Sequence, residues 1–442
     1  MGACIPHLGG PLTSQCVLAT MTLNRPHWRF APFALLTLAA PSAPRRRLPM
    51  SDPSFSLKKI AVPAFGPSLL YGVSNGATLP LIALTARELG ASLAMSGLIA
   101  ALIGVGSLMS NIPASMIISS MGERRSIIGA AVFSMLAFLL AIFAPTIWVL
   151  ALSMLMVGMA SSVFVLARQT YLTEAVPLQM RARALSTLGG TTRIGAFIGP
   201  FAGAALIHSF GITGAYWVAI GAMVGAGAIA LFAPELQVIS KQEGKPAPRM
   251  RIREIARTHA RVFLTLGVGV LLVSALRASR QVVIPLWAEQ LGLEPAVTSV
   301  IYGLVAAIDM AVFYPAGKVM DERGRIWVAI PCTLLMGLSL MSMPLTGGLI
   351  SFTLVALILG FGNGIGSGIV MTLGADSAPP GQRPSFLGLW RLMADMGACG
   401  GPVLLAGITA VASLSAAVVA SGFLGCVAAA VFWKWLPRRV SN

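Results

Sequence analysis

Asp309, Arg277 and Arg280 interrupt long apolar runs of this sequence, and they are its first candidates for chemistry. A charged side chain in the middle of a bilayer is energetically costly, so such residues are functional candidates by default. Asp309 can take up and release a proton, which makes it our candidate for proton coupling. Arg277 and Arg280 share one face of a helix, where two guanidinium groups can bind an anion or a carbonyl oxygen.

The position of Asp309 supports this choice, but a structural role is the alternative. Asp309 lies 12 residues before the loop residue Asp321, or about 18 Å along a helix, which places it near the middle of a membrane. An Arg277–Asp309 ion pair that locks two helices together would account for the same residues without any part in transport.

A duplication supplies further candidates. Gly90 and Gly292 are 202 positions apart, and the same offset relates Gly199-Pro200 to Gly401-Pro402. In an apolar chain, a parallel repeat of this length predicts two membrane halves that face each other across a substrate path.

The same offset pairs the candidate arginines with polar residues of the first half. Arg277 corresponds to Asn75 and Arg280 to Thr78. Asn75, Thr78, Arg277 and Arg280 are our candidates for the substrate site. Asp309 corresponds to Ser107, so nothing in the repeat itself demands an acid there.

The composition predicts the elements that must position these residues. Of the 442 residues, 56% are hydrophobic and 10% charged, whereas soluble domains carry about 25% charged residues. A membrane-spanning helix needs about 20 apolar residues, and twelve such stretches follow Ile60. They cover residues 61–86, 94–118, 126–144, 147–170, 184–208, 213–233, 262–288, 296–318, 326–345, 349–373, 386–410 and 414–436. The expected fold is an all-α integral membrane protein with twelve transmembrane helices in two pseudo-symmetric six-helix bundles.

The distribution of basic residues predicts the topology. The net charge is +17, and 20 of the 31 Lys and Arg residues fall in alternate loops and at the ends of the core, whereas the opposite loops hold only Arg87. This bias places both ends of the core in the cytoplasm. The basic excess therefore reports topology, and we expect no nucleic-acid partner.

We expect five segments along the chain. They are residues 1–59, outside the repeat; 60–233, the first six-helix bundle; 234–261, a basic cytoplasmic linker; 262–437, the second bundle; and 438–442, a cytoplasmic tail. Met50 is our predicted physiological start, and a disordered cytoplasmic tail is the alternative for residues 1–49. Within the linker, Arg249 to Arg261 is typical of a basic amphipathic helix at an anionic membrane surface, and a simple tether is the alternative.

One loop carries a family signature. Gly317, Asp321, Gly324 and Arg325 stand in the spacing G-x-x-x-D-x-x-G-R, which resembles the loop motif of the major facilitator superfamily. The first half keeps Gly122 and Arg124 at the corresponding loop but has Ser119 where the motif wants Asp. The resemblance extends from Ile60 to about Arg439 and implies the fold of these secondary transporters.

The chemistry of this loop indicates a latch between conformations. Gly317 permits the close approach of a neighbouring helix, and Gly324 supports a tight turn. Asp321 can accept hydrogen bonds from a helix N-terminus or pair with Arg325. A solvated turn that merely obeys the topology rule is the alternative, and Ser119 makes any latch asymmetric.

The fifth span carries a second motif. Gly195, Gly199, Pro200 and Gly203 are similar to the G-x-x-x-G-P-x-x-G-G signature of antiporters in this superfamily, with Ala204 as the departure. Small residues four apart let helices pack closely, and a proline bends a helix. We expect a pivot here, repeated in the second half by Gly397, Gly401 and Pro402. Tight packing without a gating role is the alternative.

The fourth span lacks a residue that the resemblance leads one to expect. Drug antiporters of this superfamily carry an arginine in a pattern R-x-x-q-G, but alignment on Gly158 puts Met154 at the arginine position. Proton coupling by that route is therefore in doubt. Arg168, later in the same span, is expected to extend its side chain to the membrane surface.

Arg193, Arg391 and Asp395 are candidates for pairs between helices. Arg391 and Asp395 are four positions apart and can pair within one helix, whereas Arg193 and Asp395 occupy equivalent positions of the repeat and can pair across the halves. We expect a role in structure or gating. Arg87 and Glu289 fall at the outer interface and receive no special role.

These features predict a secondary active transporter that moves a small organic molecule across a bacterial inner membrane by alternating access. Proton-coupled efflux with Asp309 as the coupling acid is the leading hypothesis, and uptake or facilitated passage of an organic anion is the second. A non-transporting receptor or scaffold on the same fold is an alternative of another class.

The sequence has no Gly-Lys-Ser/Thr phosphate loop and no metal-ligand spacing, so we expect neither an enzyme nor a cofactor. The expected partners are a small-molecule substrate and the lipid bilayer, and the expected state is a monomer.

Overall fold

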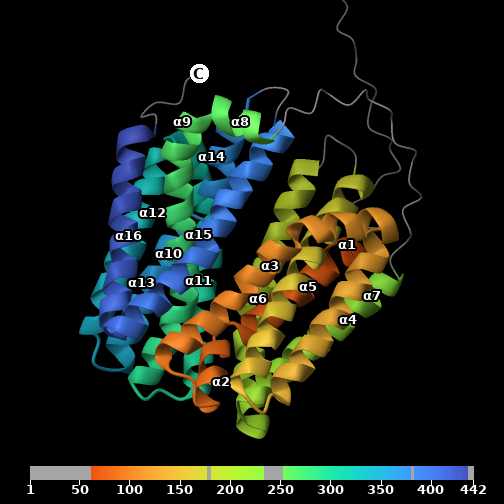
Figure 1. Ribbon diagram of the computed structural model, residues 1–442, viewed down its shortest axis with the longest axis vertical. Helices are drawn as coiled ribbons and strands as arrows, with labels where there is room; N and C mark the ends of the chain where they lie inside the picture. The colour runs from red at the N-terminus through yellow and green to blue at the C-terminus, as the bar shows by residue number, and fades with distance from the viewer. Residues whose placement is uncertain (1–60, 177–180, 233–251, 380–382, 437–442) are drawn as a thin grey trace, which may run out of the picture. The chain divides into compact units, whose positions relative to one another are not determined.

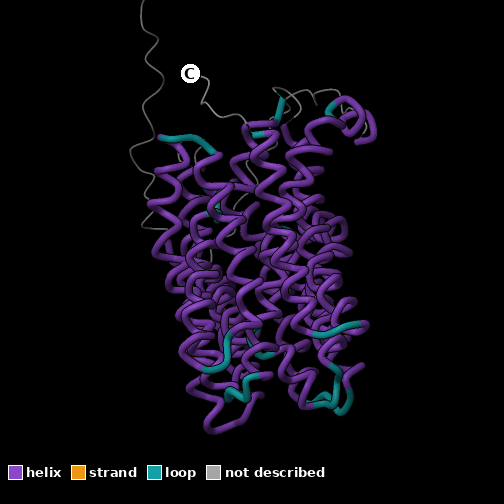
Figure 2. The backbone as a smooth tube through the Cα atoms, turned by 90° about the vertical axis from the view of Figure 1, so that its left-hand side faces the viewer, coloured by secondary structure: helices purple, strands orange, loops and turns teal. Residues whose placement is uncertain are grey.

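The computed structural model describes residues 61–176, 181–232, 252–379 and 383–436, and every regular element in these ranges is helical (Figures 1 and 2). The predicted start at Met50, the segment 1–59, most of the linker (233–251) and the tail 438–442 lie outside the described residues. The predicted division of the chain at these segments therefore stays a prediction.

The helices form two groups, which we call the first and second bundles. The first bundle comprises α1 (Ala61–Thr78), α2 (Ile82–Glu88), α3 (Leu93–Met121), α4 (Glu123–Ile142), α5 (Ile147–Ala175), α6 (Arg181–Phe210), η2 (Gly211–Thr213) and α7 (Gly214–Phe232). The second bundle comprises α8 (Ile252–Thr258), α9 (Ala260–Val262), η3 (Phe263–Gly267), α10 (Val268–Gln290), α11 (Pro295–Glu322), α12 (Ile326–Ser342), η4 (Met343–Leu345), α13 (Leu349–Ile365), α14 (Ile369–Ser377), α15 (Arg383–Val411) and α16 (Leu414–Trp435).

The number of membrane crossings agrees with the sequence. In the described part of the chain, 11 helical stretches are long and apolar enough to cross a membrane, and one of these, Thr187–Phe232, is 46 residues long. That stretch contains both α6 and α7, which η2 separates. Because one crossing needs about 20 residues, it crosses twice and the total is twelve. The prediction of an all-α membrane protein is confirmed.

Apolar side chains pack inside each bundle and also cover its outside. Phe164 and Tyr216 are fully buried in the first bundle, and Phe352 and Phe432 in the second. By contrast, Phe232 is 89% exposed on the outer surface. Large exposed apolar side chains are unfavourable in water but not in lipid, so this surface suits a bilayer.

The same glycine packing occurs in both bundles at the repeat offset. A Cβ atom added at Gly195 of α6 would lie 2.0 Å from the carbonyl oxygen of Leu69 in α1, and one added at Gly397 of α15 would lie 2.1 Å from that of Leu271 in α10. Only glycine permits backbones to approach this closely. Since Leu69 and Leu271 are themselves 202 positions apart, the duplicated sequence packs as a duplicated structure.

An ion pair joins the two bundles at the end that carries α2. Arg87 lies in the short helix α2, and its Nε donates to Glu289 Oε1 of α10 at 2.8 Å. The two residues are 202 positions apart, so they are equivalent in the repeat and meet across its pseudo-twofold axis. The sequence analysis gave these residues no role, because it treated each loop separately.

Two predicted spans are interrupted. The first span ends as α1 at Thr78 and resumes as α2 at Ile82, since Pro80 cannot donate a backbone hydrogen bond. The tenth span ends as α13 at Ile365 and resumes as α14 at Ile369 after the glycine-rich turn Gly366–Gly368. Broken backbone at membrane depth is tolerated where it lines a cavity, and the second interruption does so.

The structure describes part of the amphipathic helix predicted before the second bundle. The helix α8 covers Ile252–Thr258, and its Ile255 is 1% exposed whereas Glu254 and Arg257 are exposed. His259, directly after α8, packs edge-on against Phe386 of α15 at 5.7 Å between ring centroids. The apolar face of α8 therefore packs on the second bundle.

Candidate substrate and coupling site

A cavity of about 280 Å³ lies between the two bundles at mid-helix. Helices α1 and α6 contribute to its wall from the first bundle, and α10, α11 and α13 from the second. The lining residues are Gly76, Leu79, Arg193, Ala196, Arg277, Arg280, Gln281, Tyr302, Ala306, Asp309, Asn363 and Ser367. The structure thus brings Asp309 together with both candidate arginines of the seventh span.

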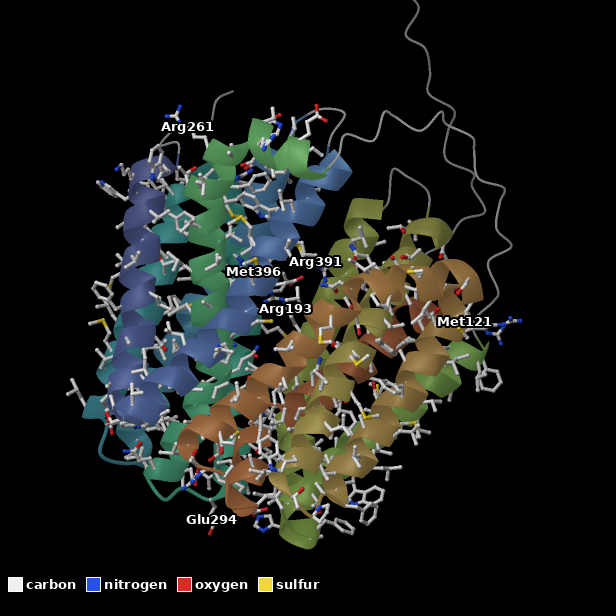
Figure 3. The ribbon with its side chains drawn as sticks, in the orientation of Figure 1. Met121, Arg193, Arg261, Glu294, Arg391 and Met396 are labelled. Carbon is white, nitrogen blue, oxygen red and sulfur yellow. The ribbon has the colours of Figure 1, made fainter. Side chains whose placement is uncertain are left out.

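Asp309 is held from both sides of the cavity. Arg193 of α6 donates through Nη1 to Asp309 Oδ1 at 3.3 Å, and Asn363 of α13 donates through Nδ2 to Oδ2 at 2.7 Å. The side chains of Arg193 and Asp309 are 33% and 19% exposed. Arg193 lies between the bundles (Figure 3), so the pair joins the first bundle to the second.

This pairing corrects two alternatives of the sequence analysis. Arg277 donates through Nη2 to the carbonyl oxygen of Gly366 rather than to Asp309. This oxygen lies at the break between α13 and α14 and also accepts the Ile369 amide. Arg193 pairs with Asp309 rather than with its repeat equivalent Asp395. The register between helices of different bundles decides these partners, and the linear sequence does not contain it.

Arg280 is the most deeply buried charge in the cavity. Arg280 is 8% exposed, and its Nε has no hydrogen-bond partner in the described part of the protein. The Nε of Arg277 is also without a partner among the described residues. Unsatisfied buried donors are costly, so the described contacts satisfy these two guanidinium groups only in part.

The candidates from the first span do not line this cavity. Thr78 is 2% exposed, and its hydroxyl donates to the carbonyl oxygen of Ser74 in the same helix at 2.9 Å. Asn75 is half-buried and is not among the lining residues. Gly76 and Leu79, each one position further along the chain, line the wall in their place.

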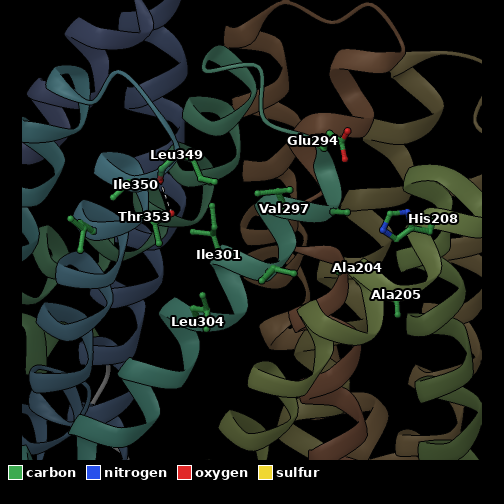
Figure 4. A pocket seen from close by; sticks show the side chains of 13 residues that line it. Ala204, Ala205, His208, Glu294, Val297, Ile301, Leu304, Leu349, Ile350 and Thr353 are labelled. Carbon is green, nitrogen blue, oxygen red and sulfur yellow. Dashed lines mark hydrogen bonds between the residues drawn. The ribbon is translucent and has the colours of Figure 1, made fainter.

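A larger cavity of about 690 Å³ lies between α6, α11 and α13 (Figure 4). Aliphatic side chains such as Val297, Ile301 and Leu354 form most of its wall, and His208 and Glu294 are its ionisable residues. Binding sites need a few convergent polar groups that orient a ligand. The smaller cavity provides them, and we therefore take it as the candidate site.

A second polar contact joins the bundles through Asp395. Asn111 of α3 donates to Asp395 Oδ2 of α15 at 3.3 Å, and Ser162 of α5 donates to Asn111 Oδ1 at 2.8 Å. Arg391 lies 3.9 Å from the same carboxylate within α15, as one alternative of the sequence analysis has it. Its side chain is 58% exposed, so this ion pair is weak.

Arg168 does not extend to the surface as expected. It is 5% exposed and lies beside two stacked aromatic rings, 4.9 Å from the centroid of Tyr71 and 5.1 Å from that of Phe164. Its Nη1 donates to the Thr192 hydroxyl at 3.4 Å. Cation–π contacts stabilise a guanidinium in an apolar interior, which explains why the side chain stays inside.

The loop motif of the second bundle forms a cluster of charges. Arg325 donates to Asp376 Oδ2 at 2.9 Å and to Asp321 Oδ1 at 3.1 Å. The hydrogen bond and charge of Asp376, together with Asp321, hold the pKa of Arg325 above its usual value. Both carboxylates belong to the second bundle, so the cluster ties α11 to α14 in this conformation. The role of a latch between conformations stays a prediction.

The predictions for the two glycines of this motif have different outcomes. Gly324 has φ 99° and its counterpart Gly122 has φ 80°, which suit tight turns that favour glycine. Around Gly317, by contrast, nothing lies within 4 Å of an added Cβ atom. The expected close approach of a helix is therefore not made here.

The arginine of the first copy of the loop contacts a helix end. Arg124 donates to the carbonyl oxygens of Ala230 and Leu231 near the end of α7. Cations at a helix C-terminus are favourable because the last carbonyl groups lack partners within the helix. Ser119, which stands in place of the acid, donates to Met116 of its own helix.

The glycine and proline motif packs α6 against α1. A Cβ atom added at Gly199 would lie 2.3 Å from the carbonyl oxygen of Val73 in α1. A Cβ atom added at Gly203 would make only ordinary van der Waals contacts. Gly401 repeats the close contact at 2.3 Å from the Ala275 carbonyl oxygen. The helices α6 and α15 continue through Pro200 and Pro402. Close packing is therefore present, and the role as a pivot stays a proposal.

Several residues of these sites escaped the sequence analysis, and three of them are in central positions. Asn363 and Tyr302 line the cavity, and Asp376 completes the loop cluster. Asn363 is the one amide between Leu349 and Ser377, and a polar residue in a spanning helix is a signal that could have found it. Asp376 is an acid at the end of the same span.

Comparisons with known proteins agree with this architecture. The Major Facilitator Superfamily profile matches residues 67–402. The multidrug resistance protein MdtG of Salmonella schwarzengrund is 28% identical over 190 residues, which cover 42% of this chain and 47% of that protein. The matched segment thus spans about half the length of this relative.

Solved structures show the same fold. A bacterial homologue of the human lysosomal transporter Spinster, in an inward-facing and unoccupied conformation, superposes with a TM-score of 0.71 at 14% identity, over 87% of this chain and 98% of that one. A D-xylose–proton symporter superposes with a TM-score of 0.64 at 16% identity, over 86% and 98%.

Twelve membrane helices in two repeated bundles around a charged cavity define a secondary transporter. The chain belongs to the Major Facilitator Superfamily. It is a multi-pass membrane protein and a transporter rather than an enzyme.

Proposed function

We propose that this protein exports a small organic molecule in exchange for protons. The observation that carries the proposal is the Arg193–Asp309 ion pair, which spans the two bundles inside the candidate cavity. The likeness to a multidrug resistance protein supports export. The proton gradient is then the energy source, and no cofactor takes part.

Asp309 couples protons to movement through its charge. When Asp309 is ionised, its attraction to Arg193 favours the arrangement seen here. Protonation removes this attraction and frees Arg193, so the bundles can rock to the alternative arrangement. A ligand that interacts with Arg193 competes with Asp309 in the same way, which links substrate binding to release of the carboxylate.

The arrangement seen here corresponds to one end of this cycle. The Arg87–Glu289 pair joins the bundles at the α2 end, whereas Ile112 and Met116, further along α3, are 76% and 66% exposed. We assign the opposite end, with the loops at Gly122 and Gly324, to the cytoplasm because those loops are basic. The conformation is then inward-facing, in a bacterial inner membrane with both ends of the core in the cytoplasm.

Inverted membrane vesicles test the proposal directly. The measurement is the collapse of a pH gradient when a dye, a drug or an organic acid is added. Wild type is compared with Asp309→Asn, which keeps the size of the side chain but cannot ionise, and with Glu254→Gln as a matched control on α8. We expect substrate-dependent proton movement in wild type and in the control, and none in Asp309→Asn.

Two other results would change the assignment. If substrate crosses but no protons move in any of the three proteins, coupling is absent and Asp309 is a structural partner of Arg193. If no substrate crosses, a receptor or scaffold on this fold becomes the better reading. Cysteine labelling of an Arg277→Cys variant distinguishes a scaffold from a transporter, because labelling of a static scaffold does not depend on which face is open.

A further inference from the structure

The charges of the candidate cavity do not balance. Its wall contains three arginines, Arg193, Arg277 and Arg280, and a single acid, Asp309, which leaves a formal excess of two positive charges. The acid is already engaged, with one oxygen bonded to Arg193 and the other to Asn363. Buried cations without a counter-ion are unfavourable, so the cavity is complementary to an anion.

We infer that the cavity binds the carboxylate, phosphonate or similar oxyanion group of a small organic anion, between Arg277 and Arg280. The two guanidinium groups project from one face of α10, and each has an Nε without a partner in the described residues. Guanidinium donors bind such oxygens in pairs, which gives direction as well as energy. This inference names the substrate class of the transporter proposed above and rests on that proposal.

The other polar groups of the wall fit the same ligand. Tyr302, which is 7% exposed, and Ser367 offer hydroxyl donors, and Gln281 offers an amide. The site is therefore rich in donors for the oxygens of an anion. An organic cation would meet the excess positive charge while the oxygens of Asp309 are occupied, so this conformation disfavours it.

The size of the cavity limits the rest of the ligand. A volume of about 280 Å³ lies at the lower limit of sites for drug-sized molecules, which run from about 300 Å³ upwards. Leu79, Ala196 and Ala306 form the apolar part of the wall. An oxyanion joined to one small apolar group matches this combination.

A matched set of ligands tests the inference by isothermal titration calorimetry on the purified full-length protein in detergent. Phenylacetate and benzylphosphonate are the anions, phenylacetamide is the neutral analogue and phenethylamine the cationic one. We expect both anions to bind, and the neutral and cationic analogues to bind at least tenfold more weakly. In Arg280→Gln the affinity for the anions should fall roughly 30-fold or more, because a buried charge contact is lost.

Control variants separate the site from a general effect of charge. Arg277→Gln should weaken anion binding in the same direction, so the test survives if Arg280→Gln fails to fold. Arg261→Gln, at the start of the second bundle and outside the cavity, should bind the anions as wild type does. Elution of each variant as a single species from size-exclusion chromatography shows that it is folded.

Three results would overturn the inference. They are no binding of either anion, equal binding of phenethylamine, and anion binding that neither cavity variant changes. Because calorimetry uses no pH gradient, its outcome is independent of the vesicle assay. Anion binding without proton movement keeps this inference and removes the coupling, whereas amine-driven proton movement without anion binding does the reverse.

Discussion

The two bundles share their packing but not their charges. Gly195 and Gly397 make equivalent close contacts with the backbones of α1 and α10. At the equivalent positions 107 and 309, however, the first bundle has serine and the second has aspartate. Close packing of helices needs small residues in both copies, so the repeat preserves them. A transport site needs its charges only once, so the two copies can differ there.

The loops between helices differ at one equivalent position. Arg325 of the second bundle pairs with Asp321 and Asp376. Position 119 of the first bundle, which corresponds to Asp321, has serine. The second loop therefore has an acid that the first lacks at this position.

Relocation of the coupling acid should have the largest effect. We expect Asp309→Ser to abolish substrate-dependent proton movement in inverted vesicles, and Ser107→Asp in the same chain not to restore it. Ser107 lies one helical turn from Asn111, whose amide contacts Asp395, so the relocated acid approaches a carboxylate rather than Arg193. Ser107→Ala alone is the control and should behave as wild type. Recovery of coupling in the double variant would contradict the contrast between the bundles.

Alanine at the shared glycines should destabilise both bundles alike. A Cβ atom at Gly195 or Gly397 would overlap a carbonyl oxygen at 2.0 or 2.1 Å, and overpacking of this kind costs about 3 kcal/mol. The measurement is the midpoint of thermal unfolding in detergent.

Each destabilised helix offers its own control for this prediction. Nothing lies within 4 Å of an added Cβ atom at Gly189 in α6 or at Gly388 in α15. Alanine there should keep or raise the midpoint, because it favours a helix by up to about 1 kcal/mol over glycine. A large effect in one bundle with none in the other would show that the packing is not shared.

The ion-pair cluster around Arg325 should respond to salt. Arg325→Gln removes an exposed ion-pair cluster, worth about 1 kcal/mol or less, and salt screens such charges. We expect its effect on the unfolding midpoint to shrink at high NaCl concentration. An effect that is the same at low and high NaCl concentration would contradict an electrostatic contribution of this cluster.

An exchange of charges across the pseudo-twofold axis should have the smallest effect. Arg87→Glu alone places two acids together, and a loss of about 0.5 kcal/mol at low salt is expected because both side chains are about one-third exposed. Adding Glu289→Arg should restore the unfolding midpoint, since the two positions are equivalent. A double variant as unstable as the single one would show that the environments of the two ends are not equivalent.

The sequence by itself determined the helices, the repeat and the positions of the charged residues along them. Hydrophobic length and the cost of a charge in lipid are properties of a short segment, and twelve spans and Asp309 could therefore be predicted without a structure. The loop motif likewise offered the pairing of Asp321 with Arg325, because the short turn at Gly324 keeps the two opposite charges close together.

Only the tertiary structure decided which residues meet across the bundles. Arg193 and Asp309 are 116 positions apart, and their contact depends on how α6 and α11 are rotated and shifted against each other. The same holds for Arg277, whose partner is a carbonyl oxygen at the break in the tenth span. Periodicity specifies which face of a helix a residue occupies. The depth and rotation at which two helices from separate bundles pack depend on all of their contacts together, and no local pattern in the sequence contains them.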